Sequence, residues 1–135
     1  MTNIGNSAFA SCIHLTRIYF QGNSPTPTND LSVFSSDTNG IVYYLLGTTG
    51  WGTLFDGLPT WNPQTQTSGA SFGVQTIQFG FILTGNSNLI VVVEASTNLV
   101  DWQPVQTNTL TTGSAYFSDP QWTNYPSRYY RLRSP

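Results

Sequence analysis

The sequence contains no lysine, and charged residues make up only 7% of its 135 residues. An ordinary soluble domain carries about a quarter. The four basic residues are all arginine and stand against six acidic ones, which gives a formal net charge of −2. So small a charge leaves little long-range repulsion between copies of the protein. Nucleic-acid binding needs a strong excess of positive charge and is not expected.

Residues that hold metals or form disulfides are also scarce. Cys12 is the one cysteine and His14 the one histidine, so neither an intrachain disulfide nor a structural zinc site is expected. The longest apolar run, residues 89–93, is too short to cross a bilayer, and no membrane insertion is expected. The first ten residues have no basic start and no long apolar stretch, and so do not predict a signal peptide.

Aromatic residues are plentiful at 14%, and they include four Trp, seven Tyr and eight Phe. Disordered chains lack aromatics in such numbers, so a folded protein is predicted. The polar positions are filled by Thr, Ser, Asn, Gln and Gly. A weakly charged surface of this kind is typical of extracellular β proteins, adhesins and fibre subunits. We therefore expect a location outside the cell or on its surface.

The apolar pattern predicts short strands separated by turns. In the first half, strands are expected over residues 15–20 and 41–46, with short helical turns near 7–12, 29–34 and 50–55. A Gly-rich closing loop is expected over 47–58, and a polar linker over 64–70. In the second half, strands are expected over 77–84, 89–95, 105–110, 115–118 and 128–133. Several short strands at turn spacing predict an antiparallel sandwich or small barrel.

Residues 4–18 read IGNSAFASCIHLTRI, which resembles one repeat of the BspA-type leucine-rich-repeat family, I-G-x-x-A-F-x-x-C-x-x-L-x-x-I. Residues 41–52 resemble the segment that closes such solenoids in environmental bacteria. From about residue 70 the chain resembles a C-terminal β domain of these surface proteins, through residues 93–99, Trp102 and residues 128–132. The resemblance implies a mainly β protein with a truncated leucine-rich-repeat-like unit at 1–62 and a small antiparallel β-sandwich at 63–135.

One repeat cannot bury its own apolar faces, so such solenoids stack many repeats. Here about one repeat and its closing segment are recognisable, which leaves the face before the first repeat open. A longer parent protein or another chain would have to cover it. The residues expected to contact another copy of the chain are Thr2, Asn3, Ile4, Phe9 and Leu15.

The predicted core has one cluster in each half. The first comprises Ile4, Phe9, Cys12, Leu15 and Ile18. The second comprises Phe79, Phe81, Val91, Val93, Trp102, Tyr130 and Leu132. In the repeat pattern the Cys12 side chain points inward and His14 faces solvent, so the pair is not expected to act as nucleophile and base.

Few residues can carry chemistry. Glu94 and Asp101 are the closest approach to a carboxylate pair for glycoside hydrolysis, and both are interpreted as structural. Calcium could use loop carboxylates such as Asp37 or Asp119, but no ligand-rich loop motif accompanies them. Neither a cofactor nor a metal is predicted.

Two further groups could contact other molecules. Arg128, Arg131 and Arg133 form the only basic cluster, interpreted as solvated strand-edge arginines or as a subunit contact. Aromatic residues could form a platform for sugars, although most are expected in the core: Trp51, Trp61, Trp102, Trp122 and Tyr125. The leading hypothesis is a non-enzymatic extracellular structural protein that stacks head to tail into a filament. The alternative is a ligand- or carbohydrate-binding attachment module from the C-terminus of a larger cell-surface protein.

Overall fold

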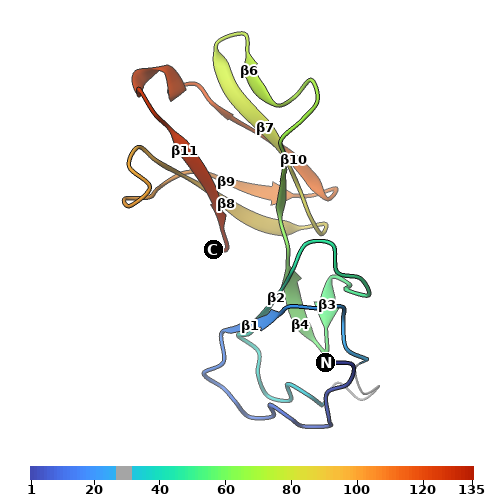
Figure 1. Cartoon of the computed structure of the whole chain (residues 1–135). Coiled ribbons are helices and arrows are strands. Elements are labelled where there is room, and N and C mark those ends of the chain that lie inside the picture. Colours follow the sequence, from blue (N-terminus) through green and yellow to red (C-terminus); the bar gives the residue numbers. More distant parts are fainter. Residues whose placement is uncertain (27–31) are drawn as a thin grey trace. The chain divides into compact units, whose positions relative to one another are not determined.

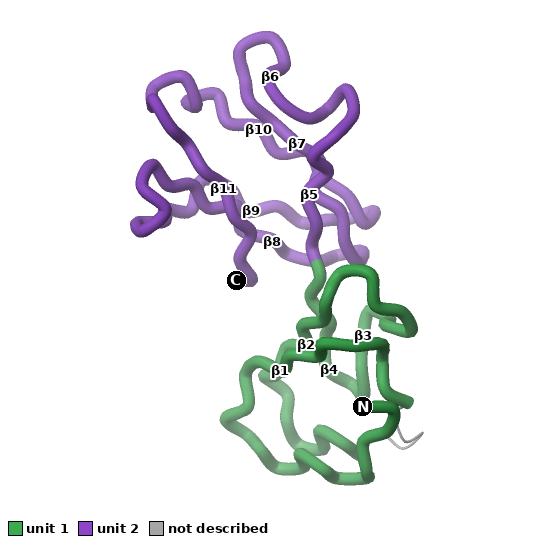
Figure 2. The backbone as a smooth tube through the Cα atoms, viewed as in Figure 1, with its two compact units in different colours: residues 1–62 green, residues 63–135 purple. Residues whose placement is uncertain are grey.

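The computed structural model describes residues 1–26 and 32–135, and within these ranges it is mainly β (Figure 1). The one helical element there is a short 3-10 helix over Trp122–Asn124. The chain divides into two compact units, which are residues 1–62 and 63–135 (Figure 2).

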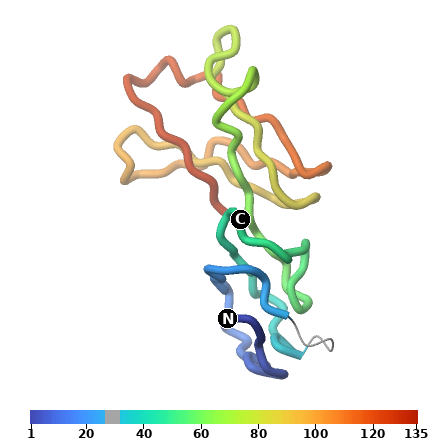
Figure 3. The backbone as a smooth tube through the Cα atoms, turned by 45° about the vertical axis from the view of Figure 1, so that its right-hand side comes forward, coloured from blue at the N-terminus to red at the C-terminus, as the bar shows by residue number. Residues whose placement is uncertain are grey.

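The sheet of unit 1 is largely parallel. Its strands are β1 (Arg17–Phe20), β2 (Ile41–Tyr44), β3 (Leu54–Phe55) and β4 (Leu58–Trp61), in the order β1-β2-β4-β3. The pairs β1–β2 and β2–β4 are parallel, whereas β3 and β4 form a small antiparallel hairpin. Parallel neighbours need a long connection between them, and the connection from β2 to β4 contains β3. Figure 3 traces this path.

Two successive coils of unit 1, a first coil over residues 3–21 and a second whose described residues are 26 and 32–45, lie one on the other with a nearly constant register. Asn3 bridges Thr26 in parallel fashion, and β1 pairs with β2 from Arg17 opposite Ile41 onward. Between these points the Phe9 amide donates to the Val33 carbonyl at 2.9 Å, and the Ser11 amide to the Ser35 carbonyl at 2.7 Å. Each of these pairings joins residues 23 or 24 positions apart. The second coil therefore repeats the path of the first.

The core of unit 1 lies inside these coils. It contains Ile4, Val33, Phe34, Val42, Phe55 and Leu58, with Leu15, Ile18, Phe20 and Trp51 packed against it. Gly40 permits close packing there, because a Cβ at this position would lie 2.8 Å from Leu58 Cδ1. The predicted core positions Ile4, Leu15 and Ile18 are confirmed as members or neighbours of this cluster.

Two predicted core residues of unit 1 are not core residues. Phe9 is 41% exposed, although its ring stacks on Phe34. Cys12 is exposed as well. Residues 5–15 form a chain of tight turns rather than a helix, and Ser7 and Ser11 adopt positive φ angles of 56° and 60°. These left-handed residues break the regular geometry on which an inward-facing Cys12 depended.

Two other helical turns were expected in unit 1. At residues 50–55 the prediction is wrong, because the segment leads into β3 instead. The one expected over 29–34 lies partly outside the described residues. From 32 onward the backbone makes further turns, with the Ser35 amide donating to the Ser32 carbonyl.

Unit 2 contains two antiparallel sheets. One consists of β5 (Gln64–Gln66), β6 (Gly73–Gln75), β7 (Gln78–Thr84) and β10 (Ser114–Asp119), with β10 on one side of β7 and both β5 and β6 paired to the other. The other sheet has the order β11-β8-β9, formed by β8 (Leu89–Ser96), β9 (Gln103–Leu110) and β11 (Tyr129–Arg133).

The core of unit 2 draws on both sheets. Phe81, Leu83 and Phe117 come from the first, and Val91, Val93 and Leu110 from the second. Phe79, Tyr130 and Leu132 pack against this cluster. Side chains from two facing sheets that meet in one layer define a sandwich-like architecture, and the predicted mainly β, antiparallel fold is confirmed for this unit.

Two predictions for unit 2 are wrong. Residues 64–66 are not part of a linker but form β5, whose polar side chains suit an edge strand that is half in solvent. Trp102 is half-buried rather than a core residue. It precedes β9, and its indole N–H donates to the Leu99 carbonyl at 3.2 Å, while its ring faces the Arg131 guanidinium at 4.4 Å.

Substitutions of two neighbouring residues at the end of β9, Leu110 and Thr109, test the assigned core of unit 2. Leu110 is fully buried and Thr109 is exposed. Leu110→Ala should lower the free energy of unfolding of unit 2 by about 2–5 kcal/mol, and Thr109→Ala by less than about 0.5 kcal/mol. Hydrogen exchange of the β7 and β8 amides reports on this unit alone. Equal effects of the two substitutions would refute the assigned core.

Candidate functional site

The outer edge of β1 is open. Among the described residues, β2 is the strand that pairs with β1, and β1 stands at the end of its sheet. The carbonyls of Thr16 and Phe20 accept hydrogen bonds from the second coil, at 3.1 and 3.3 Å. Since residues of a strand direct their backbone groups to alternate sides, the N–H and C=O groups of Arg17 and Tyr19 point away from β2. This edge can therefore accept a further strand.

Aromatic side chains stack along the same ladder. Tyr19 of β1 lies on Tyr43 of β2, with ring centroids 4.8 Å apart and planes 20° from parallel, and Tyr43 contacts Trp61 of β4 at 5.4 Å. Tyr19 ends the stack and is 68% exposed. Phe9 lies in the same way on Phe34, at 5.6 Å. Among the described residues, the first coil thus presents backbone groups that pair with no strand, together with exposed rings.

The residues predicted to contact another copy fall into two groups. Thr2, Asn3 and Phe9 are exposed on the first coil. Ile4 is buried inside its own unit, and Leu15 is half-buried against the same core. Tyr19, which sequence reasoning did not select, is the most exposed of the stacked rings. Its place one residue before the end of a predicted strand was the available signal.

A second cluster surrounds Glu94 on unit 2. Glu94 lies in the middle of β8, directly opposite Arg131 of β11, with Arg133 opposite the neighbouring Val92. Arg131 Nε donates to Glu94 Oε2 and Arg133 Nε to Oε1, each at 2.7 Å. The carboxylate side chain is 7% exposed, against 48% and 45% for the two arginines. One buried carboxylate therefore fixes two guanidinium groups.

The electrostatics of Glu94 follow from this arrangement. Burial acts to raise its pKa, but the hydrogen bonds and positive charges of Arg131 and Arg133 outweigh burial and hold the pKa below its ordinary value of 4.5. Asp101 lies in the turn before β9, where it accepts a hydrogen bond from Asn98 Nδ2 at 2.8 Å. Glu94 and Asp101, which were considered from the sequence as a carboxylate pair for hydrolysis, thus each bind different partners.

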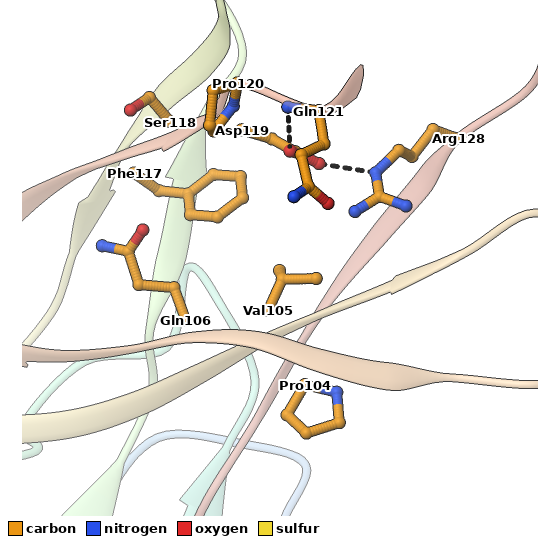
Figure 4. A pocket seen from close by; sticks show the side chains of 9 residues that line it. All are labelled: Pro104, Val105, Gln106, Phe117, Ser118, Asp119, Pro120, Gln121 and Arg128. Atoms are coloured by element: carbon orange, nitrogen blue, oxygen red, sulfur yellow. Dashed lines mark hydrogen bonds and ion pairs between the residues drawn. The ribbon is translucent and has the colours of Figure 1, made fainter. Parts of the chain in front are cut away.

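Asp119 and Arg128 form a third cluster, beside a pocket of about 380 Å³ between β9 and the end of β10 (Figure 4). Arg128 Nε donates to Asp119 Oδ2 at 2.5 Å and the Tyr130 hydroxyl donates to the same oxygen at 3.0 Å. The other oxygen accepts from the Gln121 amide at 2.8 Å. The guanidinium also lies over the Tyr125 ring, 4.2 Å from its centroid. Unlike the solvated arginine expected here, Arg128 has an almost buried side chain.

This cluster shifts two pKa values. Burial acts to lower the pKa of Arg128, but the Asp119 carboxylate raises it above its ordinary value. Burial, together with the charge and hydrogen bond of Asp119, raises the pKa of Tyr130 to about 12. Arg128 therefore stays charged and the Tyr130 hydroxyl stays protonated across the physiological range.

The aromatic residues considered as a sugar platform have separate roles. Trp51 packs against the core of unit 1, and Trp61 lies against Tyr43. In unit 2, Trp122 contacts Phe79 at 6.4 Å, and Tyr125 lies under Arg128. Trp102 lines an apolar pocket of about 370 Å³. Phe72, Phe79, Tyr129 and Tyr130 line it too.

The remaining candidate residues are separate from these clusters. Cys12 and His14 are both exposed on the first coil. Both Asp37 carboxylate oxygens are buried and have no hydrogen-bond partner among the described residues. No group of three or more His, Cys, Asp or Glu residues that could hold a metal ion occurs within residues 1–26 and 32–135.

Comparisons with family models, curated proteins and solved structures found no match to this chain. In the part of the chain that the structure describes, no helix has the length and apolar character needed to cross a membrane.

The buried Glu94 predicts a dependence of stability on pH. Because the folded pKa lies below 4.5, the stabilisation is fully present above pH 4.5 and is lost as the pH falls through the folded value. Glu94→Gln should cost about 1–3 kcal/mol at pH 7 and should flatten the acid decline of unit 2. Denaturant titrations from pH 2 to 7 measure both, with Asp101→Asn as the exposed control. An unchanged acid decline in Glu94→Gln would contradict the assignment.

Proposed function

We propose that this chain is a non-enzymatic structural protein of the cell exterior, whose copies associate through the open face of the first coil of unit 1. The observation that carries the proposal is the unpaired edge of β1, where the backbone groups of Arg17 and Tyr19 point outward. An edge of this kind is a template for strand addition by another chain.

The surroundings of the edge support association. The exposed Tyr19 and Phe9 rings offer apolar surface beside it, and burial of such surface contributes roughly 25 cal/mol per Å². A formal net charge of −2 opposes the approach of another copy only weakly. Backbone pairing and ring stacking on a second copy would repeat the contacts that already join the first coil to the second.

The proposal includes the leucine-rich-repeat-like identity of unit 1. Its support is the parallel ladder with a spacing of 23 or 24 residues, together with the repeat-like sequence of residues 4–18. A contact between two different faces that does not close on itself builds an open filament. We propose head-to-tail growth of this kind, with a terminal attachment module of a larger surface protein as the competing function.

Position 17 offers a matched pair of variants. The Arg17 amide points outward and makes no bond to β2, so Arg17→Pro removes the donor at the open edge without removing a hydrogen bond to β2. Arg17→Ser removes the same charge and keeps the donor. The wild type and Arg17→Ser should form concentration-dependent assemblies, and Arg17→Pro should remain monomeric. Light scattering after gel filtration and negative-stain electron microscopy report the outcome.

Two further variants keep the test decisive if Arg17→Pro perturbs the fold. Asn3→Asp and Tyr19→Asp place a charge on the same face and should also weaken association, whereas Thr112→Asp on an exposed turn of unit 2 should not. If the wild type and all variants are monomers at high concentration, self-association is wrong. The attachment module then becomes the better account.

A further inference from the structure

The outer face of the β11-β8-β9 sheet carries a built cationic surface that self-association does not use. Its centre is Glu94, whose two oxygens are each held by the Nε of an arginine at 2.7 Å. Two guanidinium groups against one carboxylate leave a surplus of one positive charge. The other acids of unit 2 are engaged separately, Asp119 by Arg128 and Asp101 by Asn98.

The Nη groups of the two arginines remain available. Glu94 takes only the Nε atoms, and within the described residues Arg131 Nη1 and Nη2 have no hydrogen-bond acceptor. Arg133 Nη1 donates to the Ser134 carbonyl at 2.7 Å, which leaves Nη2. Both side chains are nearly half exposed. The bonds to Glu94 fix the two guanidinium groups, so their solvent-facing donors are preorganised for an anion.

Aromatic rings flank these donors. The Arg131 guanidinium lies over the Trp102 ring at 4.4 Å from its centroid. Alternation along β11 puts Tyr129, Arg131 and Arg133 on one face, at intervals of roughly 7 Å, given the rise of an antiparallel strand. Tyr129 is 41% exposed. One ring and two cations thus follow one another along the strand, and the ring of Trp102 lies against the first cation.

We propose that this face binds an acidic polysaccharide whose sugars carry carboxylates, a polyuronate. The Nη pair of Arg131 matches the geometry of a carboxylate, and Arg133 Nη2 adds a further fixed donor. Fixed donors spaced along one strand suit a linear polymer with repeated anionic groups. The exposed Tyr129 ring offers an apolar surface to a sugar ring. An acidic peptide is less suited, because it would add along the backbone edge of β11, whereas these donors stand on the face.

Hexagalacturonate is the probe, and calorimetry with the whole chain measures its binding. Arg131→Gln and Arg133→Gln should each weaken binding by about tenfold, in proportion to the loss of one fixed guanidinium. Arg131→Lys should recover only part of the loss, because a lysine keeps the charge but not the paired donors. Arg17→Gln is the matched control, since Arg17 is the arginine outside this unit, and it should bind like the wild type. Raising the salt concentration should weaken binding.

Three results would overturn the proposal. They are an absence of hexagalacturonate binding at millimolar concentration, equal binding of neutral maltohexaose, and equal binding of a poly-L-glutamate of similar length. NMR spectra verify that each variant is folded, and shifts of the Trp102 indole and Arg Nε signals locate the ligand independently of affinity. Oligomeric state is a separate measurement, so failure here leaves the self-association proposal untouched, and the converse also holds.

Discussion

The pairing of one coil with the next governs unit 1. A coil of 23 or 24 residues contains a single short strand, and the backbone groups of that strand find their partners in the strands beside it. Within the second coil, β2 lies between β1 and β4 and is paired on both sides. Among the described residues, β1 is paired on one side alone. The outward amides of β1 and the exposed rings of Tyr19 and Phe9 on the first coil are consistent with this one asymmetry.

Unit 2 depends on a different constraint, the scarcity of charge. It contains three acids and three arginines, and the structure uses two acids to fix all three arginines. A buried carboxylate without a partner would cost several kcal/mol, so Glu94 and Asp119 hold β11 and the segment before it in place. In each of these ion pairs the arginine Nε atom donates to the carboxylate.

Much of the strand pattern could be predicted from the sequence. The strands at 89–95, 105–110 and 128–133 are found nearly at their predicted limits, because alternating or continuous apolar runs report directly on burial. The strand β5 was missed, since Gln64 to Gln66 are polar and pair at an edge where no apolar face is required. Phe9 and Cys12 were misplaced because positive φ angles at Ser7 and Ser11 are invisible to a periodic pattern.

The candidate sites were less predictable than the strands. Arg131 and Glu94 are 37 positions apart and meet only through the register of β11 on β8. Alternation along the strand predicted that Arg131 and Arg133 lie on one face, as observed. It could not predict that Glu94 is the acid that binds both of them. The first coil shows the same limit. The sequence predicts that its face is open, but it does not tell which amides of β1 point outward, because that depends on how β1 pairs with β2.

Amide hydrogen exchange of β1 at increasing protein concentration tests the central claim most directly. In dilute solution the Arg17 and Tyr19 amides should exchange rapidly, while the Ile18 amide, which faces β2, is protected. As copies associate, the Arg17 and Tyr19 amides should become protected together. If they still exchange rapidly in concentrated solution, no strand is added at this edge, and the account of self-association through the first coil is contradicted.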